Sequence, residues 1–211
     1  MTDRTTWTTT THRWAADLDR VHLDHVRRQL GRGQAAGGRR HLMLEVLAYA
    51  QDEAASLGHV GTVTVTVRSD GTVTIDDDGR GTDTRTDSDG AVVRKPVMAT
   101  ADVRFSDGVQ APRLPDGLPR RGMSTVSALS EELVHDNHRG GSSWSQTYRF
   151  GIPDDELTSI PYRGRTGTRI TFRSDVDGPT DLTDADLRAF PNLEVNRDVG
   201  PAAGGSGHAP G

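Results

Sequence analysis

The residues best suited to chemistry lie in two short segments of the chain. In the first, four side chains share the side of an expected helix opposite its apolar stripe, namely Glu45, Tyr49, Asp52 and Glu53, because positions i, i+4, i+7 and i+8 of a helix lie on one face. Polar side chains gathered on one helix face in this way are candidates for a functional site. A solvated helix face would give the same pattern, so this segment alone does not separate the two interpretations.

The second segment is Ile75-Asp76-Asp77-Asp78-Gly79-Arg80-Gly81. A carboxylate such as that of Asp77 can accept a hydrogen bond from the exocyclic amine of adenine, and Gly79 and Gly81 have no Cβ, so the backbone can approach the ring. The segment therefore indicates adenine recognition, with a plain Asp/Gly turn as the alternative. A calcium loop is rejected because neither Asp-rich run supplies a Glu at its twelfth position.

The elements that position these residues are predicted from periodicity. Apolar residues recur with helical spacing over 41–57, and Gly58 ends that helix. Alternating β-branched residues around Asp70-Gly71 predict a β-hairpin over 62–76. Further helices are expected over 18–30, 124–133 and 183–190, the last capped by Thr183, and further strands over 144–150 and 169–172. Residues 31–40 are interpreted as a flexible connector and 79–122 as a long, mostly irregular excursion.

This order of elements predicts an α+β fold. We expect a two-layer α/β sandwich, with helices on one face of a largely antiparallel, mixed sheet. The folded domain is expected over 15–194. The Thr-rich stretch 1–14 and the Gly-, Pro- and Ala-rich stretch 195–211 are interpreted as disordered tails.

Composition excludes several classes of function. The formal net charge of −5 disfavours direct binding of nucleic acid, which requires a basic surface. The chain has no cysteine, which excludes disulfides, thiolate metal sites and cysteine nucleophiles and suits the cytoplasm. Neither a signal peptide nor a membrane span is visible in the sequence. The histidines His41, His59, His135 and His138 show no metal-ligand spacing and are interpreted as surface or packing residues.

Several motifs occur together in an order that resembles a known family. They are Glu45 to Ala54, the hairpin, Asp77-Asp78-Gly79-Arg80-Gly81, Gly117-Leu118 with Gly122, Val126 to Ser130, and Thr166-Gly167-Thr168. This order resembles the N-terminal ATP-binding subdomain of the B subunit of DNA gyrase, within the wider superfamily of gyrases, heat-shock chaperone ATPases, sensor kinases and mismatch-repair ATPases. The resemblance covers about residues 18–175. It implies a Bergerat-type ATP-binding fold and a part in ATP-dependent DNA topology, an isomerase activity.

The resemblance also implies roles for individual residues. Glu45 matches the general base, and Asp77, Gly79 and Gly81 match the adenine site. Thr168 matches a hydroxyl that helps to hold the adenine acid and a bridging water. Glu53 and Arg80 match a charged pair at the pocket mouth, and a purely structural pair is the alternative. Asp52 and Gly122 complete the residues assigned to ATP binding.

Four departures from the family argue against ordinary hydrolysis. Tyr49 stands where the family has the Asn that ligates Mg²⁺, and a phenol is a poor ligand for that cation. Gly117-Leu118-Pro119-Arg120-Arg121-Gly122 replaces Gly-Leu-His-Gly-Val-Gly, so a phosphate loop is stiffened while Arg120 and Arg121 become candidate phosphate contacts. The family's Gly-Gly-Lys-Phe lid has no counterpart in 82–116, and the chain ends where the transducer domain would begin.

We therefore expect an adenine-nucleotide-binding protein with slow or lost ATP hydrolysis and no topoisomerase activity of its own. Its ligand is ATP, with the usual Mg²⁺ ligand missing. Two alternatives stay open: a non-catalytic regulatory module that binds nucleotide or a partner, and an ATPase of the sensor-kinase or anti-sigma-factor type. A gyrase-type protein or a second copy of the chain is the expected partner. An unrelated sandwich with a chance Asp-Gly loop is the remaining interpretation.

Overall fold

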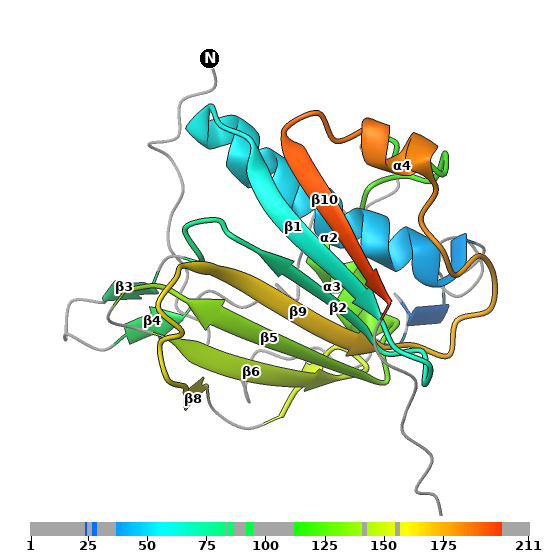
Figure 1. The fold of residues 1–211 in the computed structure, drawn as a ribbon. Coiled ribbons are helices and arrows are strands. Elements are labelled where there is room, and N and C mark those ends of the chain that lie inside the picture. The colour runs from blue at the N-terminus through cyan, green and yellow to red at the C-terminus, as the bar shows by residue number, and fades with distance from the viewer. Residues whose placement is uncertain are drawn as a thin grey trace, which may run out of the picture.

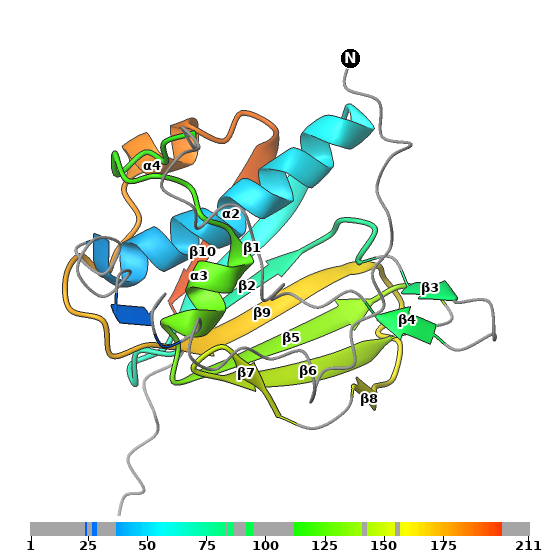
Figure 2. The same cartoon turned by 180° about the vertical axis from the view of Figure 1, so that it is seen from behind.

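One sheet dominates the computed structural model, and the helices cover one of its faces (Figures 1 and 2). The described residues are 24, 27–28, 37–82, 84–86, 92–94, 112–140, 143–154 and 157–199. The sheet has eight strands in the order β10-β1-β2-β9-β5-β6-β7, with β8 paired to β6. Only the β1–β10 pair is parallel among the pairings of this sheet. The predicted α+β sandwich with a largely antiparallel, mixed sheet is confirmed.

The predicted hairpin is formed by strands β1 (Gly61–Val67) and β2 (Val73–Asp77). The turn between them needs Gly71, whose φ of 82° lies in the left-handed region. Asp70 accepts a hydrogen bond from the Thr72 amide and closes the turn. The hairpin places Asp77 at the last position of β2. This end of the strands is the side of the sheet where the candidate site lies.

Helix α2 (Gly38–Leu57) packs across the inner face of the sheet. Gly58 ends it in a left-handed conformation, with φ 69°, as the sequence predicts. The helix begins three residues before the expected start at His41, inside the stretch interpreted as a connector. Tertiary contacts explain the extension, because the Arg40 side chain donates two hydrogen bonds to Asp186, with N···O distances of 2.9 and 2.7 Å.

The remaining strands of the main sheet are β5 (Glu132–His138), β6 (Trp144–Arg149), β7 (Ile152–Pro153), β8 (Thr158–Ser159), β9 (Gly167–Arg173) and β10 (Leu193–Val199). Strands β3 (Thr84–Thr86) and β4 (Val92–Arg94) form a separate pair within the predicted irregular excursion. Helix α4 (Asp184–Arg188) carries the predicted Thr183 cap, which accepts a hydrogen bond from the Asp186 amide.

Two sequence predictions are wrong at these elements. The helix expected over 124–133 is shorter in the structure, where α3 spans Met123–Ala128. Leu133 lies instead in β5, opposite Tyr148 and Phe172. The prediction of a disordered tail from residue 195 onward is wrong for residues 195–199, because β10 pairs with β1 over the full length of both strands. Backbone pairing with β1 therefore extends the ordered sheet past the predicted boundary.

The helix expected over 18–30 and the tail 1–14 fall almost entirely outside the described residues, although Asp24, Arg27 and Arg28 are helical. Within the described part of the chain, the helices are all too short or too polar to cross a membrane. The core lies between α2, α3 and the sheet, and its fully buried side chains include Leu42, Leu44, Leu47, Val63, Val73, Val126 and Leu133.

Candidate functional site

Asp77 lies at the end of strand β2, and one of its carboxylate oxygens accepts hydrogen bonds from the backbone. Its Oδ1 accepts hydrogen bonds from the amides of Gly79, at 2.9 Å, and Thr168, at 3.1 Å. Burial raises the pKa of Asp77 to about 6, in spite of these two hydrogen bonds. Among the described residues, none donates to Oδ2, so this oxygen can accept a hydrogen bond from a ligand. Thr168 holds the acid through its backbone N–H, whereas the sequence interpretation assigned that role to its hydroxyl.

Two glycines allow this close approach of the strand ends. A Cβ on Gly167, whose φ is 133°, would collide with the carbonyl oxygen of Asp77. A Cβ on Gly81, whose φ is 74°, would lie 2.8 Å from Oδ1 of Asn137. The Thr166-Gly167-Thr168 motif therefore matters for its missing side chain as well as for its Thr168 amide.

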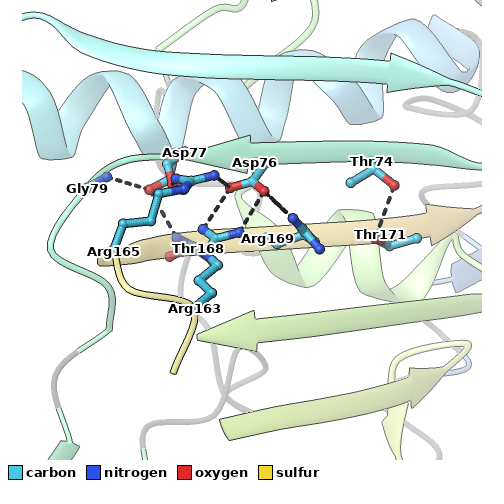
Figure 3. A network of polar contacts seen from close by, with 9 residues as sticks. All are labelled: Thr74, Asp76, Asp77, Gly79, Arg163, Arg165, Thr168, Arg169 and Thr171. Atoms are coloured by element: carbon cyan, nitrogen blue, oxygen red, sulfur yellow. Dashed lines mark hydrogen bonds and ion pairs between the residues drawn. The ribbon is translucent and has the colours of Figure 1, made fainter. Parts of the chain in front are cut away.

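A network of arginines fixes the other face of the same strand end (Figure 3). Asp76 points away from Asp77 and accepts hydrogen bonds from Arg163, Arg165 and Arg169, with N···O distances of 2.7–2.9 Å. Burial opposes ionisation of Asp76, but the guanidinium groups outweigh it and hold its pKa below the usual value. Arg165 also donates to the carbonyl oxygen of Asp77, at 3.2 Å. The network thus ties the end of strand β2, including Asp77, to the β9 side of the sheet.

Asp76→Ala is expected to lower the free energy of unfolding by about 2 kcal/mol. This value lies between the cost of breaking an exposed ion pair and that of breaking a buried one. The Asp76 side chain is only 10% exposed, and its loss leaves three guanidinium groups close together without their shared anion, two of them about half exposed. Urea unfolding measures the change, with exposed Asp177→Ala as the matched control. Equal stability of the two variants would show that the network does not hold the strand end.

Glu53 and Arg80 form the predicted charged pair. The Arg80 guanidinium donates to both carboxylate oxygens of Glu53, at 2.5 and 3.0 Å. Their side chains are 26% and 53% exposed, so the pair contributes little to stability. A small pocket beside it is lined by residues of α2, β1 and the β2 end, including Ala50, Glu53, Asp77 and Gly79. The pair therefore borders a small hollow that Asp77 also lines.

Glu45 lies fully buried beneath the loop that precedes α3. The amides of Arg121 and Gly122 donate to its two carboxylate oxygens, at 2.6 and 2.8 Å. Nε2 of His41, one turn earlier on α2, lies 3.5 Å from Oε1 of Glu45. The carboxylate predicted to be a general base is thus present, and its hydrogen bonds go to the loop predicted to bind phosphate.

His41 and Asp116 are site residues that the sequence interpretation missed. Nδ1 of His41 lies 2.7 Å from Oδ2 of Asp116, and both side chains are buried. Burial disfavours the imidazolium, but Glu45 and Asp116 outweigh it and raise the pKa of His41. The i, i+4 spacing of His41 and Glu45 was the available signal. Asp116 could not be found in this way, because its contact joins residues 75 positions apart.

The other predicted residues lie around the same loop. Arg120 forms an ion pair with Asp52, at 2.7 Å, so its guanidinium is drawn to the α2 surface. Tyr49 is 50% exposed on α2, one turn after Glu45. The structure brings Glu45, Asp52, Arg120, Arg121 and Gly122 together, and it gathers Glu53, Asp77, Gly79, Arg80, Gly81 and Thr168 at the sheet edge.

The two groups fit the implied ligands differently. The open oxygen of Asp77, buried beside glycine backbone, suits an adenine amine. The residues around Glu45 do not fit a Mg²⁺–triphosphate, because a phenol stands at 49 and the loop amides are engaged by Glu45. Within the described residues, three or more His, Asp or Glu side chains nowhere gather as a metal-ligand set.

Several known proteins are similar to this chain, although no protein-family model matches it. It is 34% identical over 161 residues to the B subunit of DNA gyrase from Streptomyces coelicolor, which covers 74% of the chain and 23% of that relative. It is 32% identical over 159 residues to the novobiocin-sensitive B subunit of DNA gyrase from Streptomyces niveus, covering 74% and 23%. It is 32% identical over 139 residues to the B subunit of DNA topoisomerase 4 from Staphylococcus epidermidis, covering 65% and 21%. The chain thus matches about a quarter or less of the length of these relatives.

Proposed function

The chain is a divergent relative of the B subunits of DNA gyrase and DNA topoisomerase 4, and we propose that it is an ATPase-type domain that binds adenine nucleotide and hydrolyses ATP slowly or not at all. It works in the cytoplasm with a gyrase-type partner protein or a second copy of itself. The relatives' names connect them with DNA topology, and we extend to this domain only the nucleotide-dependent part of that activity.

The single observation that carries the proposal is the environment of Asp77. A buried carboxylate with one oxygen fixed by two backbone amides and the other available presents a directed acceptor. Glycines beside it let the backbone pack closely around this acid, since a Cβ on Gly79 would lie 2.9 Å from Oδ1 of Asp77. Since the pKa of Asp77 is about 6, the carboxylate is mostly ionised at neutral pH and can accept from the adenine amine.

Two further observations support slow or lost hydrolysis. Tyr49 cannot replace an amide oxygen as a Mg²⁺ ligand, and metal neutralisation of phosphate charge is a large part of phosphoryl-transfer catalysis. Both carboxylate oxygens of Glu45 accept hydrogen bonds from loop amides, so they are directed at the protein backbone rather than at an attacking water molecule. These two features also favour the second candidate, a non-catalytic module that binds nucleotide to regulate a partner.

Asp77→Asn is expected to weaken adenine-nucleotide affinity about tenfold or more, because loss of a charged hydrogen bond costs about 1.5–3 kcal/mol. The amide NH₂ can face the adenine amine, so donor meets donor. Calorimetric titration with ADP measures the change. Asp70→Asn, in the exposed turn of the same hairpin, is the matched control and should bind as wild type does. Equal affinity in wild type and Asp77→Asn would refute the adenine assignment.

A further inference from the structure

The amides that should receive a phosphate are already engaged by a carboxylate of the protein. Arg121 N–H and Gly122 N–H both point at Glu45, which has no exposed surface. A phosphate oxygen that used these donors would have to displace the carboxylate or lie against it. Two anions cannot share the same pair of donors without a large electrostatic penalty.

Two further contacts hold the loop in this position. Asp116 lies near the loop's start and contacts His41, while its Oδ1 accepts a hydrogen bond from the Leu118 amide. Arg120, next to the two amides, is paired with Asp52. The loop 112–122 is therefore fastened to α2 at His41, Glu45 and Asp52, three positions spread over three turns of the helix.

The adenine end of the site is outside this arrangement. Asp77, Gly79 and Thr168 lie on strand ends and the turn after β2, and their contacts with one another involve none of the loop residues. An adenine ring can therefore meet its acceptor while the loop stays fastened. The adenosine part of a nucleotide thus meets a site that is open to it, whereas its phosphates meet amides that Glu45 already engages.

We propose that Glu45 is an internal anion that occupies the phosphate-binding amides, and that the loop contacts of Asp116 and Arg120 make the closed site selective for the adenosine part of a nucleotide rather than for its phosphates. This inference rests on the proposed function and specifies the ligand class of the same site. Opening of the loop is the step that admits a di- or triphosphate. Asp116 is a positioning residue in this account, because it acts through His41 and the Leu118 amide.

The test compares adenosine, ADP and ATP by calorimetry without metal. In wild type, the three dissociation constants should agree within about threefold, because Glu45 engages the Arg121 and Gly122 amides that a phosphate would use. In Asp116→Ala, ADP and ATP should bind about tenfold tighter and adenosine as before, since release of the loop frees the amides for phosphate. Asp177→Ala, at an exposed aspartate outside residues 112–122, should behave as wild type.

A second measurement follows the amides without any ligand. Hydrogen exchange at Arg121 and Gly122 should be slow in wild type and about tenfold faster in Glu45→Ala, relative to the Val65 amide in β1 as internal reference. Failure of adenosine to bind would refute the proposed function. Hydrogen exchange at Arg121 and Gly122 would then still test whether Glu45 engages the two amides. Wild type that prefers ATP about tenfold over adenosine, or amide exchange unchanged in Glu45→Ala, would overturn the inference.

Discussion

Acidification from about pH 7 to about pH 4 should cost the fold about 3 kcal/mol through His135 alone. This side chain is 4% exposed in β5, and neither ring nitrogen has a hydrogen-bond partner among the described residues. Its ring lies edge-on to Trp144, with centroids 4.9 Å apart. Burial lowers the pKa of His135 from 6.5 to about 4, so the folded state keeps the ring neutral where the unfolded chain is protonated.

The sign follows from this difference. Between the unfolded pKa of 6.5 and the folded pKa of about 4, the unfolded state binds the additional proton, so stability falls as the pH falls through that window. Asp77 acts in the opposite direction. Because its folded pKa is raised from 3.8 to about 6, the folded state takes up a proton first and gains stability as the pH falls from 6 towards 4. Because the contributions of His135 and Asp77 have opposite signs, the pH dependence of wild-type stability shows only their sum.

Comparison of variants separates them. His135→Leu should remove the acid-dependent loss, and it should also raise stability at neutral pH, because two buried nitrogens without partners are replaced by apolar atoms of similar volume. Urea unfolding at several pH values measures both effects. Exposed His59→Leu is the matched control and should follow the wild-type profile. A pH profile of His135→Leu parallel to that of wild type would contradict the prediction.

His135 also explains why part of the fold could not be predicted. The inward residues of β5 alternate as Leu133, His135 and Asn137, and two of the three are polar, so the strand has no apolar alternation to detect. Leu133 instead continued the helical spacing of α3. Strand β10 was missed for another reason: Leu193, Val195 and Val199 do alternate with polar residues, but the segment runs into a Gly-, Pro- and Ala-rich stretch, and its order depends on pairing with β1. Both strands are defined by contacts between distant parts of the chain.

Local signals predicted several elements of the fold and several residues of the candidate site. The Asp70-Gly71 turn, the Gly58 helix end and the Thr183 cap are formed by residues close in sequence, and each is confirmed. Glu53 and Arg80 also form an ion pair, whereas their place at the mouth of a nucleotide pocket stays a prediction. The spacing on α2 placed Glu45 on the polar face and the family resemblance implied its role as a base, but neither could reveal that loop amides 76 and 77 residues away engage the carboxylate. The network of Asp76 with three arginines likewise depends on the tertiary fold.

Tyr49→Asn is expected to raise Mg²⁺-dependent ATP hydrolysis by about tenfold or more, because an amide oxygen restores a metal ligand and a smaller side chain gives the triphosphate room. Tyr49 follows Glu45 by one turn on the same face of α2 and is half exposed there. Adding Glu45→Ala should then lower the rate about a hundredfold or more, the contribution typical of a general base. Phosphate release from ATP, with and without Mg²⁺, measures both steps.

Two comparisons make this result specific to the metal and the base. Tyr49→Phe removes the hydroxyl without supplying an amide, so it should hydrolyse ATP no faster than wild type. Combining Tyr49→Asn with Asp116→Ala should give a larger gain than Tyr49→Asn alone, because release of the loop frees Glu45 as well as the phosphate-binding amides. If Tyr49→Asn changes neither nucleotide affinity nor metal dependence, this face of α2 does not line the pocket, and the assignment of Glu45 as the base is lost with it.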